Sequence, residues 1–342
     1  MRVPAASLAV LMTFSPTLSF AQSVPAGVTN IVPDGRTATT VTATGGTSTV
    51  TTNTISGQNA FNSFSAFQVG AGNTANLMLP NGTSNLINLV RGGPAIVDGV
   101  LNAYKNGQIG GNVYFADPYG FVVGRSGVVN VGSLNVTTPT REFMDGVIGP
   151  NGQINQSSVN NLMSGNVPLS PDGFISIKGR VNAHDGARLI GENVYIGGNH
   201  SPAEVAQLDH ASKFAATVNS EGLQSASGIV VRNGSIQIVA GNSARINGRL
   251  SANGHKGRNG GDISVTAKSV SVGKHANISS SAKGTVAGNA GNITLLAQDK
   301  LTVKSGATFA ASSRAGDAGT IELSSKNTVE LASAVYDLSA PN

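Results

Sequence analysis

The sequence predicts an all-β protein that winds into one right-handed parallel β-helix, a three-sided solenoid with an N-terminal cap and short helical excursions. Only 11% of the 342 residues are charged and 44 are glycine, a composition that suits many short strands and tight corners. A unit of 28 to 30 residues also recurs in the C-terminal third. Each unit contains three short apolar strands, which is what one coil of such a solenoid requires.

The repeat is clearest where an alternating strand follows glycine. The anchor residues of three successive units lie 30 and then 28 positions apart; they are Ile263, Ile293 and Ile321. The second apolar pair of each unit is Val270 and Val272, Leu301 and Val303, or Val329 and Leu331. The third apolar point is Ile278, Phe309 or Tyr336, and a looser earlier unit contains Ile236, Ile238, Ile246 and Leu250. Alternating side chains should stack inward on their counterparts one coil away. A β-sandwich is the structural alternative, but it predicts no recurring three-strand unit.

The N-terminus has the features of a signal peptide. Arg2 supplies a positive charge, residues 5–14 are apolar, and a small-x-small pattern ends at Ala21. We therefore expect residues 1–21 to be removed and Gln22 to start the mature chain. No other apolar stretch approaches the ~20 residues that span a bilayer. The sequence predicts an exported protein that is not an integral membrane protein.

Charge and composition argue against several classes of function. The net charge of +5 comes from 22 basic residues without dense runs, which predicts no nucleic-acid partner. There is no Cys, which excludes disulfides and thiolate metal sites. The 17 acidic residues are scattered and the five His lack metal-ligand spacing. We expect no catalytic residues, no metal and no cofactor, and we predict that the protein is not an enzyme.

Two stretches interrupt the repeat pattern. Ser201–Glu204 is a capping box with proline at the first helical position, and it predicts a short helix over 202–215. Residues 201–230 are therefore interpreted as a helical excursion, after which residues 231–342 continue the β-helix. Residues 139–165 are expected to form a loop with about one helical turn.

Residues 57–138 contain the most specific motifs. Three Phe recur at intervals of three within Gly57–Val69, in the order GQNAFNSFSAFQV. Asn112–Gly124 reads NVYFADPYGFVVG, and Val128–Leu134 reads VVNVGSL. Between the first and second of these segments, Asn88 lies in an apolar stretch, Ile87–Val90, which reads INLV.

This order of motifs resembles the N-terminal secretion domain of two-partner-secretion (TPS) exoproteins, the filamentous-haemagglutinin-like adhesins. It looks closest to the leukotoxin-like filamentous adhesins, and the resemblance covers about residues 30–200. The family's Asn-Pro-Asn-Gly-Ile turn is Asp117-Pro118-Tyr119-Gly120-Phe121 here, and Asp is expected to replace Asn as the acceptor of an Asx-turn. The chain also departs from the family at Asn88, which is followed by Leu89 instead of Arg.

The resemblance implies that residues 22–200 form a TPS-type secretion domain. It implies export through the periplasm to the extracellular space or cell surface, through an outer-membrane β-barrel transporter of the TpsB type with POTRA modules. A role in surface adhesion or host contact would follow, with a host-surface or glycan ligand. The candidate secretion residues are Asn59, Phe61, Phe64, Phe67, Val69, Asp117, Pro118, Tyr119, Gly120 and Phe121. The structural alternative is that these residues only cap and turn the rod.

Two other functions are kept as alternatives. One is a β-helical polysaccharide-active enzyme, because carboxylates on successive coils can meet in space. The other is an autotransporter passenger, although residues 285–342 read as one more solenoid coil. The pattern stops in mid-repeat at Pro341 and Asn342, which leaves open whether the chain is the front of a longer fibre.

Overall fold

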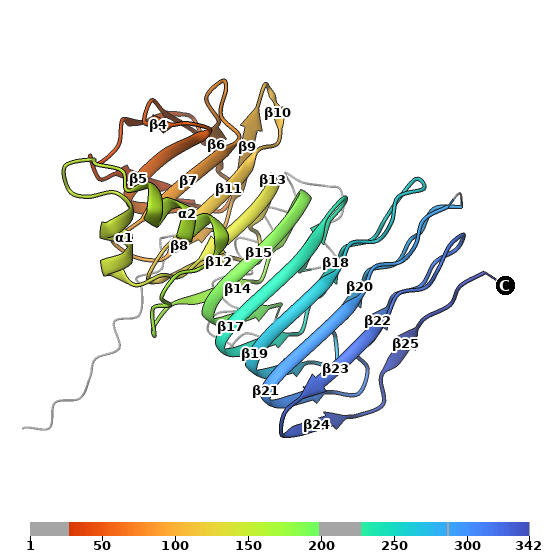
Figure 1. The fold of residues 1–342 in the computed structure, drawn as a ribbon. Coiled ribbons are helices and arrows are strands. Elements are labelled where there is room, and N and C mark those ends of the chain that lie inside the picture. The colour runs from red at the N-terminus through yellow and green to blue at the C-terminus, as the bar shows by residue number, and fades with distance from the viewer. Residues whose placement is uncertain (1–26, 198–226, 286, 342) are drawn as a thin grey trace, which may run out of the picture.

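The computed structural model describes residues 27–197, 227–285 and 287–341. The expected signal peptide, its cleavage site at Ala21 and Gln22, and the expected helix over 202–215 lie outside these residues. Figure 1 shows the described chain as a stack of coils that runs from an N-terminal cap in red to the last coil in blue.

Parallel pairing between successive coils gives the protein three faces, as the sequence predicts. The first face consists of β3 (Thr47–Thr52), β6 (Thr74–Met78), β9 (Val100–Lys105), the starts of β13 (Val128–Thr137) and β15 (Arg180–Ile196), β16 (Gly228–Val231), β18 (Arg249–Ser251), β20 (Asn277–Ser279), β22 (Thr308–Ala310) and β25 (Val335–Asp337). The second face consists of the start of β5 (Asn59–Val69), β7 (Asn85–Val90), β11 (Asn112–Ala116), the end of β13, the middle of β15, the starts of β17 (Ser235–Ile246), β19 (Ile263–Val272) and β21 (Ile293–Val303), and β23 (Ile321–Ser325). The third face consists of the end of β5, β8 (Ala95–Val97), β12 (Gly120–Val123), β14 (Phe174–Ile177), the ends of β15, β17, β19 and β21, and β24 (Thr328–Leu331).

The register of the C-terminal coils confirms the predicted repeat. Ile263 pairs with Ile293, which pairs with Ile321, and Ile236 precedes them in the same column. The second apolar pairs and the third apolar points are aligned in the same way. Strands β15, β17, β19 and β21 each pass from the second face to the third across a register shift. Such a bulge bends a strand without ending it, so one strand serves two faces.

Polar side chains form their own columns beside the apolar core. On the second face, Asn85 and Asn112 each donate to the asparagine one coil earlier, over 2.7 and 2.9 Å. On the first face a similar ladder joins Asn76, Asn102, Asn130 and Asn182. The amides inside each ladder, Asn85, Asn102 and Asn130, both donate and accept along it, so the columns reinforce the coil register.

Antiparallel elements form the expected cap at the N-terminal end. Strand β1 (Asn30–Pro33) pairs with β5, and β2 (Thr39–Thr44) forms a hairpin with β3. Two short strands, β4 (Ile55–Ser56) and β10 (Gln108–Ile109), pair with β5 and β9. The cap gives the first coils antiparallel partners, which protects strand edges from pairing with other chains.

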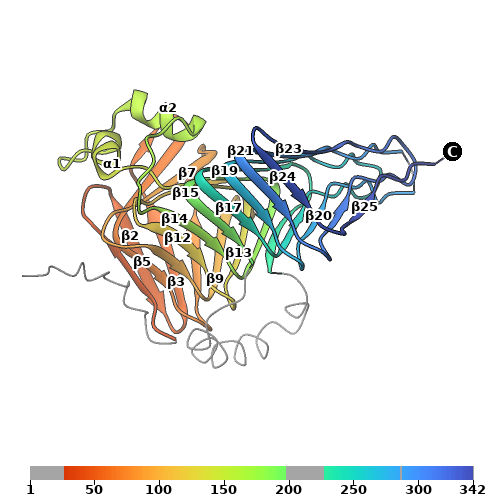
Figure 2. The ribbon, with the colours of Figure 1, turned by 90° about the horizontal axis from the view of Figure 1, so that it is seen from below.

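The expectation of a loop with one helical turn over residues 139–165 is wrong. This stretch contains two helices, α1 (Arg141–Val147) and α2 (Gln156–Ser164), which lie over one side of the N-terminal half (Figure 2). The side chains of Thr140 and Asn155 cap their N-termini, and Gly165, at φ 82°, ends α2. The helices are stable because their apolar sides pack on the β-helix, where their buried residues are Met144, Val147, Val159 and Leu162.

Two adjacent leucines on β21 test the inward and outward alternation. Leu295 is fully buried, whereas Leu296 is 36% exposed. We expect Leu295→Ala to lower the free energy of unfolding by about 2–5 kcal/mol, because it leaves a cavity between coils. The control Leu296→Ala should cost less than about 1 kcal/mol. Urea unfolding of both variants measures this, and equal losses would contradict the described register.

Candidate functional site

A buried aspartate organises the turn between β11 and β12. One oxygen of Asp117, Oδ1, accepts hydrogen bonds from the backbone N–H groups of Tyr119 and Gly120 at 2.9 and 3.3 Å. The other, Oδ2, accepts from the N–H of Ala95, one coil earlier, at 2.7 Å. The expected Asx-turn is therefore present, and the second oxygen adds a bond between coils. An Asn side chain has one oxygen and one NH2 group, so it could accept on only one of these two sides. Asp therefore satisfies all three N–H donors, whereas Asn would satisfy fewer.

The rest of the turn is held by close packing. Gly120 has φ 138°, and a Cβ there would lie 2.6 Å from the carbonyl oxygen of Phe174 on the next coil. Only glycine fits this conformation and approach. Pro118 is buried, whereas Tyr119 is partly exposed and stacks under the guanidinium of Arg141, 4.5 Å from the ring centroid. The turn thus contacts the excursion that contains α1.

An aromatic chain inside the rod joins the two candidate segments. Phe64 and Phe67 make an edge contact with centroids 5.2 Å apart, and Phe67 makes another with Phe115 at 5.2 Å. Phe115 then lies 5.0 Å from Phe121. All four side chains are buried. Such aromatic contacts add to the apolar burial, so residues 59–69 and 112–121 form one packed unit across successive coils.

Phe61 lies on the opposite side of β5. It belongs to a second apolar cluster with Ile87 and Leu89, beneath the buried residues of α1 and α2. Phe61 therefore seats the helices, while Phe64 and Phe67 fill the rod. Side chains three apart on a regular strand face opposite sides, which separates Phe61 from Phe64. Phe64 and Phe67 both point into the rod because β5 passes from the second face to the third between them.

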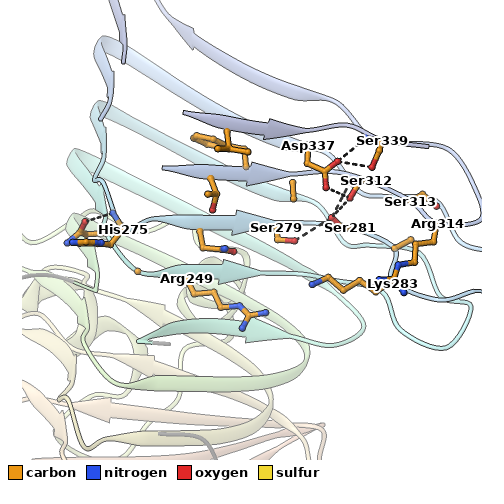
Figure 3. A pocket seen from close by; sticks show the side chains of 18 of the residues that line it. Arg249, His275, Ser279, Ser281, Lys283, Ser312, Ser313, Arg314, Asp337 and Ser339 are labelled. Atoms are coloured by element: carbon orange, nitrogen blue, oxygen red, sulfur yellow. Dashed lines mark hydrogen bonds between the residues drawn. The ribbon is translucent and has the colours of Figure 1, made fainter. Parts of the chain in front are cut away.

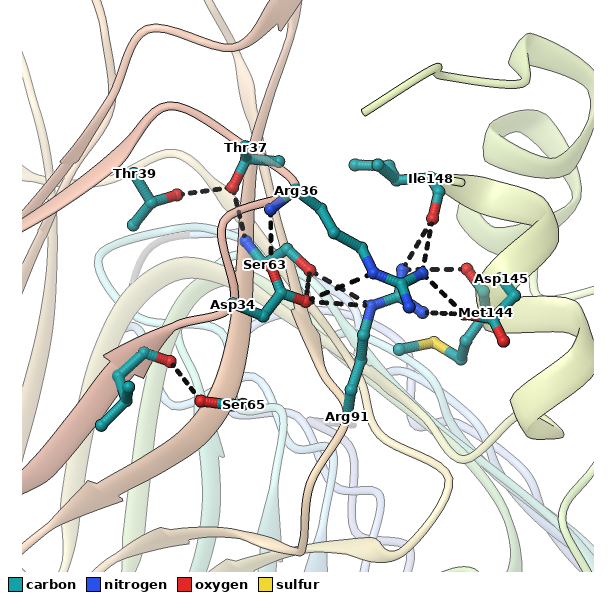
Figure 4. Close-up of polar contacts among 11 residues, drawn as sticks. Asp34, Arg36, Thr37, Thr39, Ser63, Ser65, Arg91, Met144, Asp145 and Ile148 are labelled. Atoms are coloured by element: carbon teal, nitrogen blue, oxygen red, sulfur yellow. Dashed lines mark hydrogen bonds and ion pairs between the residues drawn. The ribbon is translucent and has the colours of Figure 1, made fainter. Parts of the chain in front are cut away.

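A charged cluster connects the cap, β7 and α1 (Figure 4). The guanidinium of Arg91 contacts Asp34 at 3.3 Å and Asp145 at 2.9 Å, and it donates to the carbonyl oxygens of Met144 and Ile148 at 3.0 and 3.1 Å. Arg36 also reaches Asp145, at 2.7 Å. Burial and the like charge of Arg36 lower the pKa of Arg91, while the two carboxylates act in the opposite direction.

A family model described as the TPS secretion domain matches residues 29–323. The chain belongs to the TPS secretion domain family. Two solved structures are similar to it: the HMW1 secretion domain from Haemophilus influenzae, 15% identical with a TM-score of 0.39, covers 91% of this chain and 99% of its own. The filamentous hemagglutinin secretion domain is 17% identical with a TM-score of 0.44, over 86% of this chain and 99% of its own. No curated protein matches.

The TPS domain places the ten sequence-predicted residues in one region, and nine of them are buried. Asn59 accepts the first bond of the asparagine ladder, and Val69 lies in the rod's core. Tyr119 alone is partly exposed. Among the residues that the structure describes, no group of His, Asp or Glu could hold a metal ion, and no helix is long and apolar enough to cross a membrane.

Sequence reasoning missed the charged cluster. The strand at Asn88 lacks an immediately following arginine, but Arg91 lies three residues later and ties α1 to the cap. Its partners are 54 and 57 positions away in sequence, so no local pattern identifies them. The available signal was the position of an arginine directly after a buried strand in a chain with few charges.

We expect Arg91→Ala to lower the free energy of unfolding by about 2–3 kcal/mol, because it removes the more buried of the two cations that join Asp34 to Asp145 and its hydrogen bonds to the carbonyl oxygens of Met144 and Ile148. Arg36 remains as a donor to Asp145 and to the Ile148 carbonyl, which limits the loss. Arg91→Lys should recover less than half of this, since one ammonium cannot reproduce the planar fork. Urea unfolding and protease cleavage within residues 139–173 measure both effects. Arg125→Ala, at the turn between β12 and β13, is the control, and an equal loss there would contradict the role of Arg91.

Asp117 should make stability depend on pH. Burial raises its pKa well above the ordinary 3.8, against the smaller opposing effect of the backbone N–H groups of Tyr119, Ala95 and Gly120. A raised pKa means that the folded state favours the protonated form. The contribution of Asp117 to the free energy of unfolding is therefore fully present below its ordinary pKa of about 3.8. It is lost as the pH rises through the raised pKa of the folded state.

Urea unfolding of the wild type and Asp117→Asn from pH 3.5 to 7.5 tests this effect. The free energy of unfolding of the wild type, relative to the variant, should be greatest at the acidic end and should fall toward neutral pH. A difference that increases with pH would mean that the N–H donors dominate over burial.

Proposed function

We propose that this chain is a secreted bacterial exoprotein, or its N-terminal secretion domain. A TpsB-type outer-membrane β-barrel with POTRA modules would export it, and it would then act in surface adhesion or host contact. The observation on which the proposal rests is the TPS secretion domain match over residues 29–323. Proteins with this domain are secreted to the extracellular space or cell surface, and the family consists of secretion domains rather than enzymes.

Burial of the candidate residues supports recognition before folding. Phe64, Phe67, Asp117 and Phe121 are all fully buried in the folded β-helix. A transporter cannot contact side chains in the interior of the rod. If these residues direct export, the partner must bind them in the unfolded chain within the periplasm.

Such recognition can occur by strand pairing between the unfolded chain and the transporter. An extended segment can add to an exposed sheet edge, where backbone hydrogen bonds give affinity and pockets for alternate side chains give specificity. Residues 59–69 and 112–116 are strands in the folded protein. Their extended conformation and their Phe side chains suit this mode of binding.

Folding outside the cell would then favour outward movement. Each coil packs mainly on its neighbours, so coils can form one after another as the chain emerges. Every completed coil buries apolar side chains and opposes return through the pore. We propose that residues 1–21 are the signal peptide, that residues 22–200 are the secretion domain, and that residues 231–342 follow the excursion at 201–230 as further coils.

Expression with and without the partner transporter tests the export route. The protein should appear in the medium only in the strain that has the transporter, and it should remain in the periplasm otherwise. Equal release from both strains would contradict the proposal.

Two core phenylalanines separate recognition from folding. Phe67 and Phe309 are both buried in the rod, and replacing either with Ala should cost about 3–5 kcal/mol. Phe67→Ala should reduce the secreted fraction several-fold, because it removes an apolar side chain from a candidate segment. Phe309→Ala, with a similar folding defect outside those segments, should still be exported and should be cleaved more readily in the medium. Equal export of the two variants would mean that these segments only shape the rod.

A further inference from the structure

The positive charge of the chain is concentrated in the C-terminal coils. Residues 27–197 contain eight Lys and Arg and eight Asp and Glu, whereas residues 227–341 contain twelve Lys and Arg against six Asp and Glu. Residues 27–197 are therefore neutral, whereas residues 227–341 carry a net charge of +6, more than the +5 of the whole chain. A field of one sign on one part of a surface favours partners of the opposite charge.

A groove of about 750 Å³ lies on the first face in this region. It crosses β18, β20, β22 and β25, so it spans four successive coils. Its volume is within the range of ordinary ligand sites. Figure 3 shows the groove with Lys283 and Arg314 close together at one part of it and Arg249 facing them from an earlier coil.

The fold itself stacks the cations. Parallel bridges join Gly254, Ala282 and Ser313 on successive coils. Lys283 and Arg314 directly follow two of these residues, so they occupy equivalent positions one coil apart, about 4.8 Å along the rod. Arg249 adds a third positive charge from the start of β18.

These cations have no ion-pair partner among residues 227–285 and 287–341. None of the three forms an ion pair with a described carboxylate, and the buried Nε of Arg249 has no hydrogen-bond partner there. Partial burial and the like charges of Arg249 and Arg314 lower the pKa of Lys283. Stacked cations that repel one another are destabilising unless an anion joins them, so the arrangement suits a ligand.

Hydroxyl groups line the groove beside the cations. Ser281 and Ser312 lie 3.2 Å apart, and Ser312 donates to Asp337 at 2.9 Å. Serine hydroxyls both donate and accept, which matches the hydroxyl groups of a sugar. Among the described residues that line the groove, Asp337 is the one carboxylate; it lies at the β25 end, where its oxygens can accept from sugar hydroxyls.

We infer that this groove binds an acidic polysaccharide. Arg249, Lys283 and Arg314 would contact its carboxylate or sulfate groups, and the serine hydroxyls would contact its sugar hydroxyls. A regular polymer suits the site because both the polymer and the stacked coils repeat along their length. The inference rests on the proposed adhesive function and names its ligand class. Single-stranded nucleic acid fits less well, because Phe309, the one Phe, Tyr or Trp among the described residues that line the groove, is buried and offers no exposed ring for stacking.

Binding by the purified full chain at 150 mM salt tests the inference. The probes are polygalacturonate, which has only carboxylates, dextran sulfate, which has only sulfates, neutral dextran, and a single-stranded oligodeoxynucleotide. The groove variant is Lys283→Gln with Arg314→Gln. The control is Lys268→Gln with Lys326→Gln, which removes the same charge from exposed residues outside the groove. Thermal unfolding of each variant confirms that it is folded.

The wild type should bind at least one acidic polymer and should not bind dextran. The groove variant should weaken that binding at least about tenfold, while the control should change it by less than about twofold. The acidic polymer that binds more tightly identifies sulfate or carboxylate as the preferred group. No binding of either acidic polymer, equal losses in the two double variants, or equally tight binding of the oligonucleotide would overturn the inference. Because the test uses purified protein, any of these results leaves the transporter-dependent export test unaffected.

Discussion

The structure depends on in-register parallel stacking, in which each residue of a strand lies over its counterpart one coil away. Ile236, Ile263, Ile293 and Ile321 form one such column. The register places apolar residues over apolar residues inside the rod and amides over amides outside it. A shift by one residue would turn every inward side chain outward. The aromatic chain, the asparagine ladders and the stacked cations all follow from this one constraint.

A stack of this kind has an end that requires separate protection, and the cap provides it. Antiparallel β1 and β2 cover the first coil, and α1 and α2 cover Phe61 on its outer side. Arg91 joins these parts, because its guanidinium contacts Asp34 of the cap and Asp145 of α1. A single planar cation can satisfy several oxygens from different elements, which an ammonium cannot do as well. The cluster of Asp34, Arg36, Arg91 and Asp145 thus joins the cap to α1 and to the rod.

The repeat was predictable because periodic apolar residues in the sequence become the columns of the fold. The anchors at Ile263, Ile293 and Ile321 pair as their spacing indicates. The helices over 139–165 were not predictable, because their stability comes from Ile87, Leu89 and Phe61, which lie far away in sequence. The Arg91 cluster was missed for the same reason. The Asx-turn at Asp117 was expected from local chemistry, but its bond to Ala95 exists only once the coils are stacked. Local and periodic features were therefore accessible from sequence, and contacts between non-repeating segments were not.

The two halves of the rod relate differently to folding. In the N-terminal half, Phe64, Phe67 and Asp117 are accessible only in the unfolded chain, so any partner that binds them loses access as the coils form. In the C-terminal half, Lys283 and Arg314 become neighbours only when their coils stack, so a groove that binds an anion exists only in the folded chain. Under the proposed function, folding buries the residues that direct export, and it creates the groove that binds the anion. Export and adhesion then cannot compete for the same chain, because each requires a folding state that excludes the other.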